Sequence, residues 1–319
     1  LESNLLTEVE VDDEGVSGLF EEEYRLSVDV DVEDLAEWAI ATSAASQMKD
    51  RITFSSENGF FPPAILWKHP NALDIAVEGL VKYEDVKGVI HNHTTYSDGA
   101  HSVGEMARAC MDRGYEYLVV SDHSKSAFYA NGLREDDLVR QWAEIDALNN
   151  TLEDFIIYKS VESDILVDGS LDYADDILRE FDLVIASVHA HLNMDIDKAT
   201  QRLIKAIEHP ATRILGHMTG RLLLGRPGYP VDHAKVLDAC AANDVAIELN
   251  ANPHRLDIDH RYLGMAMERG VLVSVNPDAH HVDGIDDIRY GAMMARKGGL
   301  ASEFCLNVKD RSAFESWLG

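Results

Sequence analysis

The strongest constraint on the fold is an alternation of short, β-branched runs with longer amphipathic segments that begins near Val86. Each run suits one buried strand and each following segment suits a helix, which is the pattern of a parallel α/β sheet. Seven such units favour closure into a barrel over an open, doubly wound sheet. No Gly-x-Gly-x-x-Gly follows the first run, so a dinucleotide site is not indicated. The seven expected strands are residues 88–91, 117–121, 156–162, 183–189, 214–217, 245–250 and 272–276.

Histidines and carboxylates stand at the ends of six of these expected strands. The carboxyl ends of parallel strands meet at one mouth of a barrel, where the active sites of such folds lie. We therefore expect these side chains to converge although they are far apart in the sequence. The set is His91, His93, Asp98, His123, Glu162, His189, His217, Asp278 and His280.

A single histidine at a strand end is more often a hydrogen-bonded structural residue than a ligand, but a joint set needs another explanation. Nine such groups would be destabilising if they were ionised and unpaired, and costly if they were buried without partners. Metal cations remove that cost, and imidazole with carboxylate but no thiolate suits Zn, Mn or Fe. Because nine ligands exceed the needs of one tetrahedral ion, we expect two or three divalent ions.

The motifs around these residues resemble a known family. His-x-His, Asp-His-Ser, Val-Glu-Ser-Asp, Ser-Val-His, Gly-His and Asp-Ala-His, in this order, are similar to the polymerase and histidinol phosphatase (PHP) superfamily. The resemblance covers about residues 86–307. The stretches 123–133, 220–229 and 250–257 are most similar to the PHP domain at the C-terminus of bacterial family X DNA polymerases.

The resemblance implies a distorted seven-stranded (β/α)7 TIM-like barrel that hydrolyses phosphate esters, with Glu162, Asp278 and His280 as catalytic residues. It implies an Mn-stimulated 3′-to-5′ exonuclease or a related 3′-end-processing enzyme of DNA repair. Glu162 would bridge ions. The implied ligand sets are His91, His93, Glu162 and Asp278 for a first ion, Asp98, His123 and His280 for a second, and Glu162, His189 and His217 for a third.

Residues 1–85 are read as a separate acidic α+β segment, and residues 86–319 as the phosphoesterase domain. A helix is expected over 33–49 and a turn at 60–63. Residues 42–47 and 61–63 resemble a remnant of the polymerase palm and thumb. The family's Gly-Asp-x-Asp strand is missing, and Asp29 and Asp31 read as a solvated edge, so we expect no nucleotide incorporation.

Three basic residues are candidates for binding substrate phosphates: Lys125, Arg221 and Arg255, with Arg226 a weaker one. Arginine offers a bidentate geometry to phosphate. The alternative is that they pair with the many carboxylates. Asn250 and Asn252 are candidates for orienting the ligands.

The formal net charge of −29 counts against a protein that holds DNA by neutralising phosphates. It can also reflect adaptation to a saline cytoplasm. DNA 3′ ends are the expected partner, a phosphorylated small molecule of the histidinol-phosphate type is the first alternative substrate, and a non-catalytic metal-stabilised scaffold is the second alternative. The sequence does not predict the oligomeric state.

No apolar run approaches the roughly 20 residues that a membrane span needs, and no secretory signal opens the sequence. We therefore expect a cytoplasmic protein with no membrane partner. Cys110, Cys240 and Cys305 are far apart and read as small buried apolar residues of a reducing compartment.

Overall fold

The computed structural model describes residues 8–12, 15–19, 25–28 and 79–319. The first three stretches are strands β1 (Glu8–Asp12), β2 (Gly15–Leu19) and β3 (Arg25–Val28), which pair antiparallel in the order β1-β2-β3. The helix expected over 33–49 and the turn expected at 60–63 lie outside the described residues.

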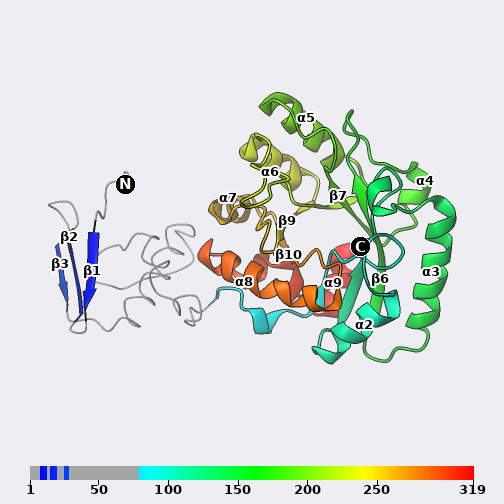
Figure 1. The fold of residues 1–319 in the computed structure, drawn as a ribbon, viewed down its shortest axis with the longest axis horizontal. Coiled ribbons are helices and arrows are strands. Elements are labelled where there is room, and N and C mark those ends of the chain that lie inside the picture. The colour runs from blue at the N-terminus through cyan, green and yellow to red at the C-terminus, as the bar shows by residue number, and fades with distance from the viewer. Residues whose placement is uncertain (1–7, 13–14, 20–24, 29–78) are drawn as a thin grey trace.

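Residues 79–319 form the predicted barrel of seven parallel strands (Figure 1). All six neighbouring pairs are parallel and follow the chain order from β4 to β10. Every strand lies within a few residues of its predicted position. The strands are β4 (Gly88–Val89), β5 (Tyr117–Val120), β6 (Ile156–Asp164), β7 (Leu183–Ser187), β8 (Thr212–Leu215), β9 (Ala246–Asn250) and β10 (Val273–Asn276).

The gap between the edge strands β4 and β10 is closed by side-chain and loop contacts. The amide of Asn307 accepts from the Val275 N–H at 2.6 Å and donates to the Gly88 carbonyl at 3.2 Å. Past the strand ends, Asn92 and Ala279 form a parallel bridge. The two edges are therefore held at both ends, and the barrel is nearly closed.

Helices surround the barrel (Figure 1). Several begin with side-chain caps that satisfy free N–H groups, as at Ser102, Asp195 and Asp310. In the described part of the chain, no helix has the length and apolarity to cross a membrane. The helices are α2 (Val103–Asp112), α3 (Glu135–Asn149), α4 (Asp175–Leu178), α5 (Ile196–Ile207), α6 (His233–Ala242), α7 (Leu263–Glu268), α8 (Ile288–Lys297) and α9 (Arg311–Leu318). The 3-10 turns are η2 (Tyr83–Asp85), η3 (Phe128–Ala130), η4 (His260–Tyr262), η5 (Val282–Asp287), η6 (Ser302–Phe304) and η7 (Leu306–Val308).

The last helix, α9, covers the amino ends of the strands. Phe314 stacks on Tyr117, the first residue of β5, with ring centroids 4.4 Å apart, and the Arg213 guanidinium near the start of β8 lies over Trp317. Upstream of β4, Leu80 and Val81 are buried, and the Val81 N–H donates to the Leu300 carbonyl. With its amino end covered, the barrel presents the opposite mouth for a site.

The barrel interior has two layers. The lower layer is an apolar cluster that includes Ile90, Val119, Ile185 and Ile214. Strand residues alternate between the two faces of a sheet. Further along the same strands, every second residue continues to face the interior, and there the buried side chains are polar, as at Glu162. The alternation thus directs these side chains into the mouth.

Candidate metal centre

The structure brings all nine predicted ligand residues together at the carboxyl mouth of the barrel. Their donor atoms fall into groups in which all lie within 4.8 Å of one another. These groups are His91, His93 and Asp278; His93, Asp98, His123 and His280; and His123, Glu162 and His189. The remaining member, His217, has Nε2 2.8 Å from Oε1 of Glu162.

Local backbone geometry aims two of these residues. His91 and Asp278 follow the edge strands β4 and β10 and have φ values of 63° and 52°. This left-handed region costs non-glycine residues on the order of 1–3 kcal/mol and is associated with functional sites. The carboxylate of Asp278 lies 3.1 Å from Nε2 of His93. The strained backbone therefore lies between the edge strands β4 and β10, where Nε2 of His91 and the carboxylate of Asp278 are 3.6 Å apart.

Glu162 is the centre of the cluster. Its carboxylate oxygens lie 3.3 Å from His91 Nε2, 3.1 Å from His189 Nε2 and 2.9 Å from His123 Nδ1. Both oxygens, together with His91 Nε2 and His123 Nδ1, are buried without a hydrogen-bond partner. Buried polar atoms without partners are rare and costly. Acceptor atoms that converge in this way fit divalent cations held between them.

The pKa values of the clustered groups depend on the contacts around Glu162. Burial raises the pKa of Glu162, but the charges of His189, His91 and His123 outweigh it and hold that pKa well below its usual value. Burial lowers the pKa of His189, yet the Glu162 and Asp164 carboxylates raise it to about 10. Ionised carboxylates at the centre require positive charge beside them, which either imidazolium groups or metal ions supply.

Two buried carboxylates pair with the outer ring nitrogens of predicted ligand histidines, and neither was among the predicted site residues. Oε2 of Glu248 lies 2.6 Å from Nδ1 of His91, and Asp164 pairs with Nδ1 of His189. Both leave Nε2 of the imidazole facing Glu162. Carboxylates that orient metal-binding histidines are a common feature of such sites. A signal was present, because Glu248 interrupts an apolar strand at an inward-facing position.

Another buried carboxylate, Asp122, fixes the loop that carries Asp98. It accepts the backbone N–H of Thr94 at 2.7 Å, the Thr94 hydroxyl at 2.6 Å and the Gln141 amide at 2.6 Å. This ties the loop after β4 to the residue that precedes His123. The ligands from two strands are thereby held in register.

The two candidate orienting asparagines have different positions. Asn250 donates through Nδ2 to Asp278 Oδ2 at 3.0 Å and to Glu248 Oε1 at 2.9 Å, so it contacts the cluster. Asn252 accepts the backbone N–H of His254 and shapes the loop after β9.

The three candidate phosphate-binding residues also differ. Lys125 Nζ pairs with Glu135 at 2.7 Å, and Arg221 is engaged with Asp259 at 2.8 Å and with backbone carbonyls of its neighbouring loop. Arg255 Nε lies 3.5 Å from Oδ2 of Asp278. Of these three, Arg255 is the one whose guanidinium reaches the cluster.

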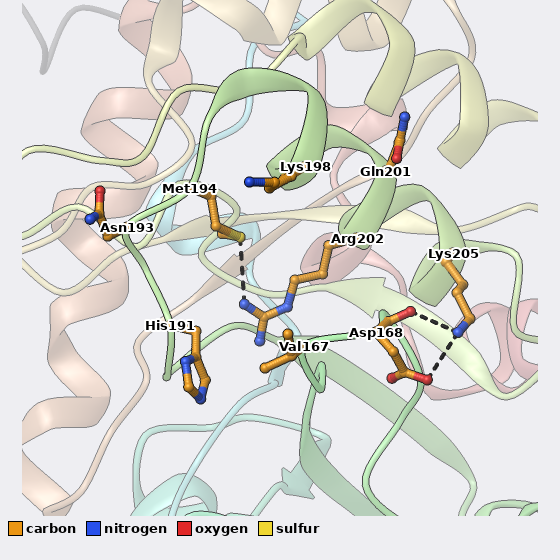
Figure 2. A pocket seen from close by; sticks show the side chains of 9 residues that line it. All are labelled: Val167, Asp168, His191, Asn193, Met194, Lys198, Gln201, Arg202 and Lys205. Carbon is orange, nitrogen blue, oxygen red and sulfur yellow. Dashed lines mark hydrogen bonds and ion pairs between the residues drawn. The ribbon is translucent and has the colours of Figure 1, made fainter.

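A cavity of about 420 Å³ lies on the α5 side and is lined by none of the nine predicted ligands (Figure 2). Arg202 projects into it from α5 and donates to the carbonyls of Leu166 and Ala190 at 2.8 and 3.1 Å, and also to that of Ile165. These carbonyls belong to the loops that follow Asp164 and His189. Arg202 therefore braces two loops of the cluster from outside.

Comparison with known proteins adds relatives of two kinds. The chain is 39% identical over 296 residues to the DNA polymerase/3′-5′ exonuclease PolX of Bacillus subtilis, covering 90% of this chain and 51% of that protein. It thus spans about half the length of this relative. It is 30% identical over 201 residues to a "Probable phosphatase" of Caldanaerobacter subterraneus subsp. tengcongensis, covering 60% of this chain and 74% of that protein. No family model matches.

Among solved structures, the chain is similar to the histidinol phosphate phosphatase of Lactococcus lactis, which was crystallised with Zn, L-histidinol and phosphate. The TM-score is 0.46 at 15% identity, covering 66% of this chain and 93% of that one.

Proposed function

The chain belongs to the polymerase and histidinol phosphatase superfamily and is a metal-dependent phosphoesterase, and on this premise we propose that it hydrolyses phosphate esters at the 3′ ends of DNA. The observation that carries the proposal is the extent of the similarity to the DNA polymerase/3′-5′ exonuclease. It covers 90% of the chain and so extends beyond residues 79–319, whereas the similarity to the probable phosphatase covers 60%.

The nine clustered residues would hold the ions in three sets. His91, His93 and Asp278 form the first set, Asp98, His123 and His280 the second, and His189 and His217 the third, with Glu162 bridging between ions. Bound divalent ions supply an activated water and neutralise charge on the phosphoryl group. The side chain of His280 is 39% exposed, so it faces the solvent from which substrate would arrive.

Arg255 would bind the phosphate. Its side chain is 20% exposed and its Nε lies 3.5 Å from Asp278, so the guanidinium would bind a substrate oxygen next to the predicted metal ligands. Lys125 and Arg221 would bind a phosphate only after their ion pairs with Glu135 and Asp259 are broken. We therefore assign them a smaller role in substrate binding.

A small-molecule phosphatase is the second candidate, because probable phosphatases match 60–68% of the chain and the net charge of −29 disfavours binding of a polyanion. Comparing hydrolysis of a 3′-recessed oligonucleotide with that of phosphomonoesters, with Mn²⁺ present, separates the two. The proposal expects nucleotides or phosphate to be released from the 3′ end. Rapid hydrolysis of phosphomonoesters without any oligonucleotide cleavage would favour the small-molecule phosphatase.

A further inference from the structure

Two aromatic side chains stand exposed at the rim of the mouth. Phe128 and Tyr129 form most of the 3-10 turn η3, between β5 and α3, and are 84% and 64% exposed. Their rings meet edge to face, with centroids 6.5 Å apart and planes at 76°. Large aromatic side chains are normally buried on folding, because exposure of their surface to water is unfavourable.

The loop that carries this aromatic pair is firmly anchored. The Ser126 hydroxyl donates to Asp164 Oδ2 at 2.6 Å, and the Leu133 N–H donates to the His123 carbonyl at 2.8 Å. Gly132 packs so closely on the Ser124 carbonyl that a Cβ would not fit. Because its ends are held by the loops that carry the ligands, the turn presents the two rings at a fixed place.

That place is beside the metal cluster. The Tyr129 ring centroid is 6.4 Å from that of His123. The planes of these two rings are inclined at 55°. Phe128 contacts the Tyr129 ring and adds to the same exposed aromatic surface. A phosphate bound at the cluster would have its own nucleoside within reach of these rings.

Given the DNA-directed function proposed above, we infer that Phe128 and Tyr129 form a stacking platform for the bases next to the scissile phosphate of a single-stranded 3′ end. Aromatic rings bind every base through its π face, so the platform is tolerant of sequence. It supplies affinity without phosphate neutralisation, which a chain of net charge −29 provides poorly. A substrate without a base would gain nothing from it.

The test compares Phe128→Ala, Tyr129→Ala and Tyr129→Phe with the parent chain on two substrates. One is a single-stranded oligonucleotide, and the other is the same strand with abasic residues at its last two 3′ positions. Val139→Ala, which shortens a side chain 62% exposed on α3, is the matched control. A second readout is the fluorescence of a 3′-terminal 2-aminopurine on a strand whose last linkage is a non-hydrolysable phosphonate, with Mn²⁺ present, which reports stacking without turnover.

We expect each alanine variant to raise KM for the normal strand about tenfold with little change in kcat, because stacking is equal in the ground and transition states. Neither variant should raise KM for the abasic strand further, and Tyr129→Phe and Val139→Ala should resemble the parent. Quenching of 2-aminopurine should weaken in both alanine variants. Equal losses on both strands, or no loss on either, would overturn the platform and leave the proposed function standing. Absence of oligonucleotide cleavage by the parent chain would overturn both.

Discussion

Glu248 Oε2 lies 2.6 Å from Nδ1 of His91, and this contact turns the other nitrogen of the ring toward the cluster centre. His91 Nε2 then lies 3.3 Å from Glu162. Glu248 also accepts the backbone N–H of His217 at 3.1 Å and the Asn276 amide at 2.8 Å. One carboxylate from β9 therefore orients ligands from two other parts of the barrel.

Glu248→Gln should weaken metal binding without unfolding the chain. The variant keeps the size of the side chain but removes the charge that orients His91, and loss of such a partner typically costs about 10- to 100-fold in metal affinity. Competition titration with a metal-binding dye measures this directly. Asp238→Asn removes an exposed carboxylate that pairs with Arg269 and should leave affinity unchanged. Equal affinity in Glu248→Gln and the parent would contradict the role of Glu248.

The purified chain should contain two to three transition-metal ions, and Glu162→Ala should contain fewer. The carboxylate at the centre lies within 4.0 Å of five imidazoles, so its removal separates the groups that share it. Hydrolysis should be abolished while the circular dichroism spectrum is retained. Elemental analysis that finds one ion or none in the parent chain, or near-normal activity in the variant, would refute the bridging role.

The sequence predicted the barrel and the gathering of the nine residues because both depend on local patterns. Alternation along strands and a histidine or carboxylate at the strand end are visible without any tertiary contact. Glu248 illustrates what is harder to see: its place in an apolar strand marks it as unusual, but its role depends on His91, a partner 157 positions away.

Closure of the barrel was predicted, but its means was not. Asn307 joins β4 to β10 by hydrogen bonds to Gly88 and Val275. In the sequence these partners lie 219 and 32 positions before it. Nothing in the sequence around Asn307 indicates that it closes the barrel. The engagement of Arg221 with Asp259 is likewise a tertiary contact, and it weakens the phosphate-binding role that sequence position alone favoured for Arg221.

Acid should destabilise the chain partly through His260, which is not one of the nine clustered residues. Burial, with a smaller contribution from the charge of Lys297, lowers the pKa of His260 to about 4, although the Asp259 carboxylate 3.4 Å away raises it. In the unfolded chain an imidazole titrates near ~6.5. Between these values the unfolded state binds more protons, so stability is full above about pH 6.5 and falls as the pH drops toward 4.

His260→Gln should remove this part of the acid sensitivity, on the order of 2–3 kcal/mol at pH 4. Urea unfolding under EDTA, at several pH values between 4 and 7.5, measures the difference between the two chains. The difference curve should slope below pH 6.5 and be flat above it. A curve that is flat throughout would show that His260 does not couple folding to protons.

The last prediction concerns how a chain of net charge −29 binds a polyanion. Long-range repulsion would exclude DNA if total charge governed the encounter. The Debye length is about 8 Å at physiological salt, so carboxylates on the far side of the barrel are largely screened from a phosphate at the mouth. The charge near the phosphate therefore governs contact, and its positive part would come from the divalent ions and from Arg255.

We accordingly expect kcat/KM on a single-stranded oligonucleotide to be nearly flat, or to rise, between low and moderate salt. Added salt relieves repulsion and also weakens phosphate contacts, but with about one basic contact the second effect is less than roughly threefold between 50 and 200 mM. Arg255→Ala should lower kcat/KM more than any substitution within residues 1–50, and Arg221→Ala should act through its loop and have a smaller effect. Steady-state rates at matched Mn²⁺ measure both. A fall in kcat/KM of several hundredfold over this range would contradict the prediction, because it would mean that basic side chains neutralise several phosphates at once. The described residues at the mouth do not form such a basic track. Lys125 and Arg221 are already paired there with Glu135 and Asp259.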